Sequence, residues 1–294
     1  MAAIEERYIS LLTDFGFKRI FGTKPNKDLL INFLNSLFDG RQVVKDLMYL
    51  NGENIGEVYA DRKAIFDVYC ENEHGEKFIV EMQNAYQKFF KDRSLFYTTF
   101  PIRDQASKGA SWDFRLTHVY TIAILNYDIN EPSFCADKQV HNVSLRDSDT
   151  KEVFYDKLDF YYVEVSKFNK SADELVTMFD KWQYVLKNLS FLDKRPKALQ
   201  EKIFSRLFSE ASIARFTPSE LKGYEDSKKA YRDIKNSIDT AREEGREEGR
   251  AEGREEGLKE GFISTAKNLL SRNIDTATIM KATGLTEEEI NKLR

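Results

Sequence analysis

The sequence predicts an α/β protein in which a mixed central sheet is flanked by helices and followed by a helical C-terminal extension. Two runs of alternating apolar character, at 64–70 and 78–83, indicate a β-hairpin. Segments rich in β-branched and aromatic residues, at 117–128 and 158–168, are typical of further strands. Apolar residues at helical spacing before and after these strands predict the flanking helices.

The helices are predicted from apolar residues that recur every three or four positions. Residues 26–39 carry one broad apolar stripe, and residues 84–108 form a long amphipathic region of aromatic and basic side chains. Residues 171–189 open with a Ser/Asp start signal, and helical patterns continue from there to about residue 240. The short run 45–51 suits a strand.

Composition excludes several classes of protein. With 294 residues, of which 41% are apolar, the chain can form one large domain or two ordinary ones. Its formal net charge of −4 gives no global sign of nucleic-acid binding, so a basic surface would have to be local. Cys70 and Cys135 form neither a metal-ligand spacing nor a disulfide framework, and no apolar run approaches the roughly 20 residues that span a bilayer. We therefore expect a soluble cytoplasmic protein without a signal peptide.

A charged repeat changes the pattern at 242–261, where every fourth residue is glycine. In a helix, the glycines from Gly245 to Gly261 would cost roughly 4–5 kcal/mol relative to alanine. Contacts between neighbouring Glu and Arg side chains return only about 0.2–0.5 kcal/mol each. The segment is thus either a marginal charged helix or a solvated linker. The glycine row would also let another helix approach closely, so self-association is the alternative interpretation.

The last segment, 262–294, predicts a compact module of short helices. Asp275 and Thr286 suit helix N-caps, and Thr286 with Glu289 matches the capping-box spacing. Gly284 lies at the break between two helices, as in a helix-turn-helix. DNA binding by this module is one interpretation, and a small helical hairpin without that role is the other.

The predicted hairpin brings two carboxylates together. A three-residue loop at 73–75 would place Gly75 where a left-handed backbone conformation is required. That register sets Asp67 directly opposite Glu81 on one face of the strands. The other face is predicted to be core and holds apolar residues alone: Phe66, Val68, Cys70, Phe78, Val80 and Met82.

Opposed carboxylates on one sheet face need a positive charge between them. Directly opposite strand residues have Cβ atoms about 4.5–5.5 Å apart, so Asp67 and Glu81 would repel each other. A divalent cation such as Mg²⁺ removes this repulsion, because it takes oxygen ligands from one or two carboxylates. Gln83 points to the same face and can hold a water molecule or a phosphate oxygen. The alternative is that the pair lies on the exposed face of an edge hairpin and is merely solvated.

The order of these elements is similar to that of PD-(D/E)xK nucleases. It most closely resembles the PD-(D/E)xK transposase branch, the recombination-promoting nuclease and putative-transposase family. The resemblance spans residues 8–190 and rests on these stretches: LTDFGFKRIFG (12–22), KDLLINFLNSL, FDVYC, FIVEMQ, FFKDRSLFYTTFPIRDQASKG (89–109), HVYTIAILNYD and FYYVEVSKF. An Arg/Glu/Gly repeat followed by a short helical module also fits this family.

The resemblance implies a restriction-endonuclease-like core and a divalent metal, Mg²⁺ or alternatively Mn²⁺, held by Asp67, Glu81 and the backbone carbonyl of Met82. It makes Asp67, Glu81 and Gln83 candidate catalytic residues, and Asp14 joins them because the family places an N-terminal acidic motif near its active site. Gln83 departs from the wider superfamily, which usually has lysine at this position. A glutamine cannot supply that positive charge, but it can orient the attacking water.

Lys18, Arg93 and Gln105 are the candidate DNA contacts, and each has an alternative role. Lys18 lies four residues after Asp14, so the two could form a surface ion pair worth roughly a few tenths of a kcal/mol. Arg93 and Gln105 could instead snorkel or cap a helix.

Two functions are consistent with the sequence. The first is a metal-dependent DNA endonuclease of mobile-element origin that hydrolyses phosphodiester bonds in DNA recombination. The second is a catalytically inactive DNA-binding or oligomerising protein that retains the nuclease fold, and an RNA nuclease is a third hypothesis. Expected partners are DNA and a second copy of the chain bound through the C-terminal helix, with no membrane.

We expect four segments: a PD-(D/E)xK nuclease-like domain over 1–190, a helical extension over 191–240, the repeat over 241–261 and the helix-turn-helix-like module over 262–294.

Overall fold

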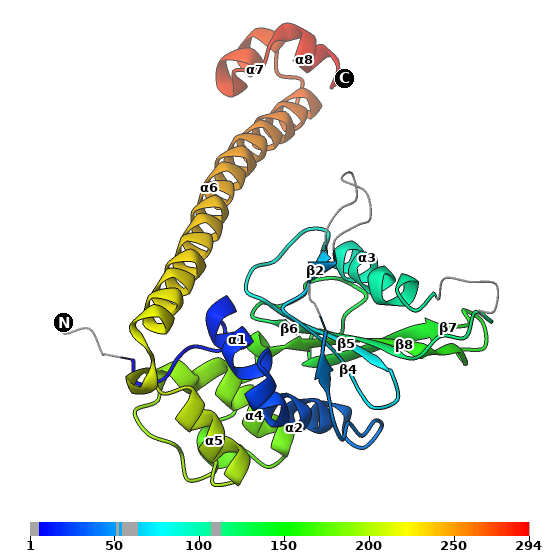
Figure 1. Cartoon of the computed structure of the whole chain (residues 1–294). Helices are drawn as coiled ribbons and strands as arrows, with labels where there is room; N and C mark the ends of the chain where they lie inside the picture. The colour runs from blue at the N-terminus through cyan, green and yellow to red at the C-terminus, as the bar shows by residue number, and fades with distance from the viewer. Residues whose placement is uncertain (1–5, 51–52, 55–63, 107–112, 294) are drawn as a thin grey trace. The chain divides into compact units, whose positions relative to one another are not determined.

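The computed structural model describes residues 6–50, 53–54, 64–106 and 113–293 (Figure 1). The chain divides into two units, Met1–Arg232 and Asp233–Arg294. Each unit is described by itself.

The first unit is built on a six-stranded mixed sheet with strand order β1-β4-β5-β6-β8-β7. Strand β5 pairs with β6 and β6 pairs with β8 in parallel, whereas the remaining pairs are antiparallel. A separate two-stranded ladder joins β2 and β3. The strands are β1 (Met48–Tyr49), β2 (Glu53–Asn54), β3 (Ala64–Ile65), β4 (Val68–Glu71), β5 (Lys77–Gln83), β6 (Val119–Leu125), β7 (Val140–Arg146) and β8 (Val153–Glu164).

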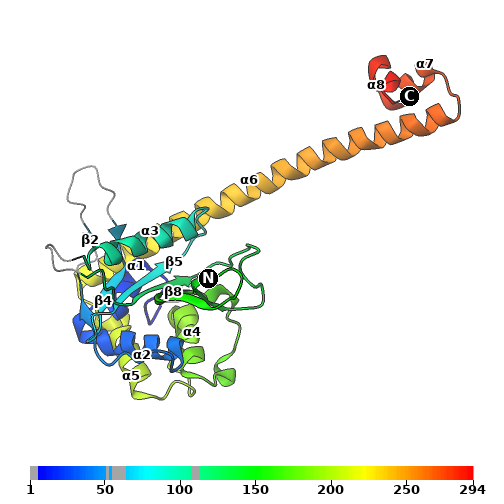
Figure 2. The same cartoon turned by 90° about the vertical axis from the view of Figure 1, so that its right-hand side faces the viewer.

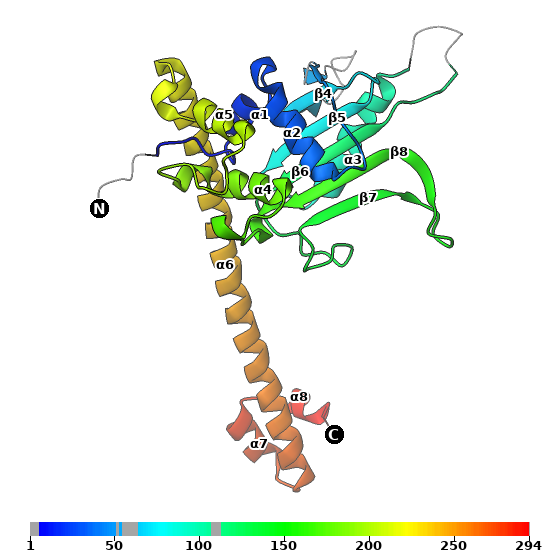
Figure 3. The same cartoon turned by 90° about the horizontal axis from the view of Figure 1, so that it is seen from below.

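Helices cover both faces of this sheet (Figures 2 and 3). Helices α1 (Asp14–Phe21), α2 (Lys27–Phe38), α4 (Met178–Asn188) and α5 (Lys202–Glu210) share one large core with the inner residues of β4, β5, β6 and β8. The opposite face is covered by α3 (Phe90–Arg103), which follows β5 and leads to its parallel neighbour β6. Because both faces are covered, every residue of β6 is buried. The mixed sheet with flanking helices confirms the predicted fold class.

The hairpin forms with the predicted turn. Cys70 pairs with Phe78, and Gly75 has a φ of +74°, the left-handed conformation that the loop requires. The Asn72 side chain closes the turn by accepting hydrogen bonds from the backbone N–H groups of His74 and Glu76, both at 3.0 Å. The turn therefore fixes which residues of β4 and β5 face each other.

The predicted core face of the hairpin is correct except for Phe66. Val68, Cys70 and their partners on β5 lie in the large core. Phe66 instead packs with Tyr69 on the side that α3 covers. The chain bends at Asp67 before β4 begins, and this bend interrupts the alternation of side chains on which the prediction for Phe66 depended.

Strand β7 was not predicted. It lies at the edge of the sheet, where β8 is its one partner among the described strands, and apart from the buried His141 its residues are partly buried or exposed rather than forming an apolar run. The same pairing extends β8 toward its N-terminus, where Val153 and Phe154 are exposed. An edge strand of this kind has too little apolar periodicity to be recognised from the sequence.

Helix α6 (Pro218–Ser271) begins in the first unit and ends in the second. It contains the whole charged repeat as helix, and nothing lies within 4 Å of a Cβ built on any glycine from Gly245 to Gly261. None of the helices that the structure describes combines the length and the apolar character needed to cross a bilayer.

The second unit ends in α7 (Thr276–Thr283) and α8 (Glu287–Asn291). The predicted N-caps are confirmed: Asp275 accepts a hydrogen bond at the start of α7, and Thr286 forms a capping box with Glu289 at the start of α8. The predicted break at Gly284 is left-handed, with a φ of +73°. A small core holds the module together: Ala266, Ile279, Leu285 and Ile290.

Candidate active site

Asp67 lies where the pairing between β4 and β5 ends. The last paired residues are Val68 and Val80, and Asp67 precedes β4. Its Oδ2 accepts a hydrogen bond from the backbone N–H of Met82 at 2.9 Å, which replaces the strand partner that β5 lacks at this point. In a β-strand the N–H and C=O of one residue point to the same side, so the Met82 carbonyl faces the edge that Asp67 occupies.

Glu81 is the most deeply buried acid of the candidate site, with 7% of its surface exposed. Its Oε2 lies 3.3 Å from the donating Nε2 of Gln83. Its Oε1 is buried and has no hydrogen-bond partner among the described residues. Burial, reinforced by the negative charge of Asp67, raises the pKa of Glu81 to about 7.

Asp67 shares this electrostatic environment. Burial raises its pKa above the usual range, and the hydrogen bond from Met82 and the charge of Lys18 oppose this effect without cancelling it. Two carboxylates whose pKa values are both raised lie in an environment that neutralises them incompletely. Such a pair favours a cation beside it.

Two basic residues approach the carboxylates from different helices. From α1, the Nζ of Lys18 lies 2.6 Å from Asp14 and 3.7 Å from Asp67. From α3, an Nη of Arg93 lies 3.8 Å from Glu81. At these distances neither cation forms a close hydrogen bond with Asp67 or Glu81. Both therefore place positive charge near the carboxylates without neutralising them through close hydrogen bonds.

Asp14 is linked to the site by its ion pair with Lys18. Thr13 caps α1 by accepting a hydrogen bond from the N–H of Gly16, which puts Asp14 in the first turn of the helix. The predicted i,i+4 pair between Asp14 and Lys18 is present, and the Lys18 ammonium lies between the carboxylates of Asp14 and Asp67. Asp14 thus orients Lys18 and remains largely exposed itself.

The structure does not bring Gln105 to this site. Its amide oxygen accepts hydrogen bonds from the N–H and the hydroxyl of Thr117, at 2.6 and 2.9 Å. Thr117 precedes β6, so this contact lies at the opposite end of the parallel strands from Gln83. Gln105 therefore holds the connection from α3 to β6, which is close to the capping alternative considered above.

The donor set fits a small, hard divalent cation. Within the described part of the chain, no three His, Cys, Asp or Glu side chains are arranged to hold a metal. The site instead offers the carboxylates of Asp67 and Glu81 and the carbonyl of Met82. Mg²⁺ accepts such oxygen-only sites and keeps several water molecules, whereas Zn²⁺ prefers nitrogen and sulfur ligands. The unpartnered oxygen of Glu81 is the observation that supports the fit.

A polar junction beside the site was not predicted. Asn126 donates to the side chain of Asn84 at 3.4 Å and to the hydroxyl of Tyr231 at 3.3 Å, and Asn84 donates to the backbone carbonyl of Leu12. Asn84 and Asn126 directly follow the neighbouring parallel strands β5 and β6. In α/β sheets, ligands bind at the carboxyl ends of parallel strands, so polar residues just past two such strands indicate a site. This pattern was present in the sequence.

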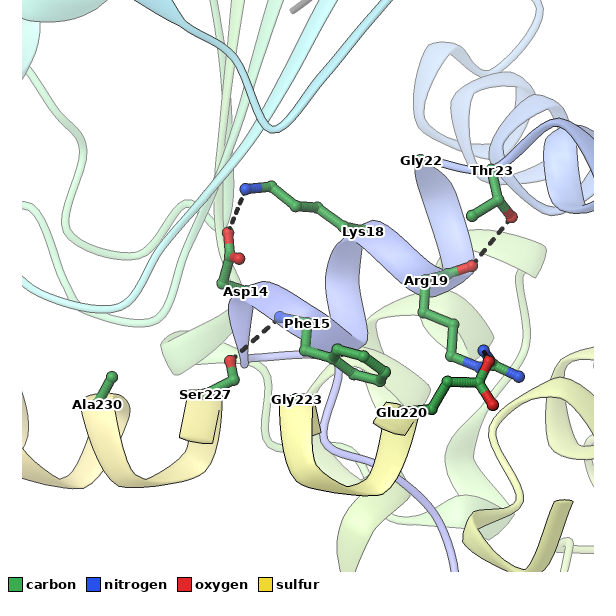
Figure 4. Close-up of a pocket in the computed structure, with 10 residues that line it drawn as sticks. All are labelled: Asp14, Phe15, Lys18, Arg19, Gly22, Thr23, Glu220, Gly223, Ser227 and Ala230. Carbon is green, nitrogen blue, oxygen red and sulfur yellow. Dashed lines mark hydrogen bonds and ion pairs between the residues drawn. The ribbon is translucent and has the colours of Figure 1, made fainter. Parts of the chain in front are cut away.

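A pocket of about 640 Å³ lies next to this junction, between α1 and the first turns of α6 (Figure 4). Asp14 and Lys18 line one side of it, and Glu220, Gly223 and Ser227 line the other. The Ser227 hydroxyl accepts the N–H of Phe15 at 3.1 Å, so α6 supplies a second cap to α1. A Cβ at Gly223 would lie 3.2 Å from the Phe15 ring, which makes this close approach favour glycine.

Comparison with known families matches two regions of the chain. The profile of the PD-(D/E)XK nuclease family transposases matches residues 11–241, and the profile of the Rpn/YhgA-like nuclease family C-terminal HTH domain matches residues 259–294. No curated protein and no solved structure shows significant similarity to the chain. PD-(D/E)XK nucleases generally use divalent metals, as the donor set suggests. The chain therefore belongs to the PD-(D/E)XK nuclease family transposases and carries a helix-turn-helix domain at its C-terminal end.

Proposed function

We propose that this protein is a metal-dependent DNA endonuclease of mobile-element origin that hydrolyses phosphodiester bonds in DNA recombination. The observation that carries the proposal is the pair Asp67 and Glu81, both with raised pKa values, in which one buried Glu81 oxygen has no partner among the described residues. The family and its general use of divalent metals support it.

In the proposed mechanism the chain binds and orients the reactants. Asp67, Glu81 and the Met82 carbonyl would hold the cation, Mg²⁺ or Mn²⁺. When bound, that cation supplies positive charge to the phosphate and lowers the pKa of a water molecule. The amide oxygen of Gln83 accepts a hydrogen bond from the attacking water and so orients it. Lys18, held by Asp14, and Arg93 neutralise the phosphate from two sides.

The alternative function is a catalytically inactive DNA-binding or oligomerising protein that retains the nuclease fold. Gln83 favours it, because an amide cannot supply the positive charge that lysine gives most of the superfamily at this position. Hydrolysis of RNA is a further alternative within the nuclease proposal.

For partners, we propose DNA and a second copy of the chain. The HTH profile supports DNA binding by the C-terminal module. The second helix of this module begins with three consecutive glutamates (Glu287–Glu289), so the candidate phosphate contacts are Lys281 and Lys292. The open glycine row of α6 supports association with another helix.

Two free cysteines support a cytoplasmic location, where thiols stay reduced.

For the organisation of the chain, we propose a nuclease-like domain over 1–190 and a helical extension over 191–240. The repeat over 241–261 then leads to the helix-turn-helix-like module over 262–294. The two family matches, at 11–241 and 259–294, support a nuclease part and a C-terminal module.

A nicking assay tests the proposed function. Supercoiled plasmid and a labelled RNA are incubated with the full chain in Mg²⁺, in Mn²⁺ and in EDTA. We expect DNA nicking that needs either cation and falls by about a hundredfold or more in Asp67→Asn and in Glu81→Gln. Asp137→Asn, which alters an exposed aspartate, is the matched control and should nick like the unmodified protein. A folded protein that nicks no nucleic acid in either metal would establish the inactive alternative.

A further inference from the structure

Two exposed aromatic side chains lie on the segment that follows the strand of Glu81, and they have no part in the mechanism above. Tyr86 and Phe89 belong to the short segment between the end of β5 at Gln83 and the start of α3. They flank Gln87, which accepts a hydrogen bond from Arg93 at 2.8 Å. Since Arg93 also lies 3.8 Å from Glu81, this segment is tied to the candidate active site.

Both rings are exposed, and the Tyr86 ring is held by its neighbours. Tyr86 is 52% exposed and Phe89 65% exposed. The Tyr86 ring meets the Tyr127 ring edge to face at 5.8 Å, and Tyr127 meets Phe90 in the same way at 6.3 Å. Phe90 is almost fully buried, so a chain of edge-to-face ring contacts anchored in the core supports Tyr86 from one side. A supported ring with an open surface is suited to receive another flat ring.

Positive charge accompanies these rings. The Lys88 Nζ lies 5.7 Å from the centre of the Phe89 ring, within reach of a cation–π contact. Lys88 has no ion-pair partner within the described ranges, whereas nearby Lys91 pairs with Glu131. An open aromatic ring and an unpaired lysine on one short segment, with Arg93 of α3 bonded to the Gln87 of that segment, match the composition of surfaces that bind single-stranded nucleic acid.

Exposure of a phenylalanine alone would not support a site, since scattered exposed apolar residues are common. Phe154 and Phe191 are more exposed than Phe89, at 80% and 82%, but no cation lies over either ring in the described part of the chain. They also lie outside the carboxylate site. What sets Tyr86 and Phe89 apart is their position next to Arg93 together with the neighbouring charge.

We propose that Tyr86 and Phe89 form a stacking platform for an unpaired base next to the phosphodiester that is cut. The preferred substrate is then single-stranded or locally opened DNA. In an intact duplex the faces of the bases are stacked on each other, so only a base that has left the stack can lie against a protein ring. This inference rests on the proposed nuclease function.

A binding experiment tests the platform without requiring turnover. Full-length Glu81→Gln protein is titrated with a single-stranded oligonucleotide that carries 2-aminopurine, a base whose fluorescence is quenched by stacking. We expect quenching on binding, and a loss of affinity of roughly tenfold when Tyr86→Ala or Phe89→Ala is added. Tyr86→Phe should retain the affinity because it keeps the ring. Phe191→Ala is the matched control for removing an exposed ring and should bind like the parent.

A cleavage experiment then tests the substrate class. The otherwise unmodified chain and each ring variant are given one sequence as a single strand, as a duplex with one unpaired base and as a perfect duplex. We expect the first two substrates to be cut at least about tenfold faster than the perfect duplex, and Tyr86→Ala and Phe89→Ala to lose this difference. Equal cutting of all three substrates, or unchanged quenching and affinity in both alanine variants, would overturn the platform. Failure to cut any DNA would instead refute the nuclease function, and the quenching result would still decide whether the rings stack on a base.

Discussion

At the scale of single residues, Glu81 has the least favourable environment of the site. It is buried beside Asp67, and Arg93 is its nearest cation at 3.8 Å. Its pKa rises to about 7 from an ordinary value of 4.5. The unfolded chain therefore loses this proton near pH 4.5, whereas the folded chain keeps it until about pH 7. Between these values the folded state binds more protons, so the stability of the metal-free protein falls as pH rises.

The first prediction concerns this pH dependence. In EDTA, the unfolding free energy of Glu81→Gln relative to the unmodified protein should rise by about 3 kcal/mol between pH 4.5 and pH 8, because glutamine carries no charge to bury. Denaturant unfolding at both pH values measures this difference. Glu152→Gln, at an exposed glutamate, is the control and should leave the pH dependence unchanged. If Glu81→Gln follows the same pH curve as the unmodified protein, Glu81 is not an uncompensated buried acid.

Gln83 provides the second prediction. The side chain is 8% exposed and donates to Glu81, so a lysine there would place its ammonium next to the carboxylates and the phosphate. We expect Gln83→Lys to fold normally and to raise metal-dependent nicking by about tenfold, which corresponds to roughly 1.4 kcal/mol of activation barrier. Gln83→Met keeps the length without the charge and should not raise the rate. If Gln83→Lys loses both its fold and its metal binding, the glutamine has a structural role.

The register of the hairpin could be predicted because it depends on a local feature: Gly75 fixes the turn, and the turn fixes the pairing as far as Val68 and Val80. Pairing ends there, and the bend at Asp67 brings its carboxylate to the Met82 N–H, a contact that the register alone does not specify. The approach of Arg93 to Glu81 could not be predicted in this way. It depends on how α3 packs across the sheet, and neither residue spacing nor turn chemistry specifies that packing.

At the scale of elements, the first turns of α6 hold the segment that carries Asp14 and Lys18. The Tyr224 hydroxyl accepts the N–H of Ser10 and donates to Glu6, both at 2.9 Å. Ser227 accepts the N–H of Phe15 near the start of α1. These contacts span more than 200 residues of sequence and hold the segment that carries Asp14 and Lys18. Helical spacing predicts that α6 exists, but not that it caps α1.

The third prediction tests this cap. Ser227→Ala removes the acceptor for the Phe15 N–H and should cost about 1 kcal/mol of unfolding free energy, as the loss of a helix cap does. Nicking should fall as well, because α1 orients Lys18 beside Asp67. Ser227→Thr, which keeps the hydroxyl, should recover both properties.

Ser237→Ala is the matched control on the same helix. Its hydroxyl only donates to the carbonyl of Asp233 one turn earlier, and it is exposed. Its stability should stay within about 0.5 kcal/mol of the unmodified protein. Equal effects of the two serine substitutions would show that the contact with α1 contributes nothing.

Predictability differed among the elements for a physical reason. Helix α2 could be placed because the six apolar residues of its stripe are all buried against one core. Strand β7 could not, because an edge strand buries only part of one face. The sequence does not decide between helix and linker for the charged repeat, since its glycines disfavour a helix and its Glu–Arg contacts favour one weakly. In the structure the repeat is a continuous part of α6.

At the scale of the whole molecule, the boundary between the two units falls inside α6, between Arg232 and Asp233. Ser227, which bonds to α1, and Tyr231, which bonds to Asn126 just past β6, both precede this boundary. The repeat beyond it is exposed throughout. Removing it would take little apolar surface from the first core.

The fourth prediction follows from this boundary. A chain that ends at Asp239 should keep its melting temperature and its metal-dependent nicking, whereas a chain that ends at Phe216 loses the contacts of Tyr224 and Ser227 and should lose both. Calorimetry and the nicking assay measure these outcomes. Light scattering should give a smaller assembly for the chain ending at Asp239 than for the full chain, if the glycine row mediates association. An unchanged mass would make the repeat a spacer, and a large drop in melting temperature at Asp239 would show that it packs on the core.

The four-residue period of the repeat also affects how this chain can change in evolution. Each unit adds about 6 Å to a helix and advances it by slightly more than one turn. The side chains of the repeat are solvated, and nothing lies within 4 Å of a Cβ built on its glycines, so the gain or loss of one unit disturbs no packed atom. The length of α6 can therefore vary in steps of four residues while both cores stay intact, and relatives that differ in the number of units should fold equally well.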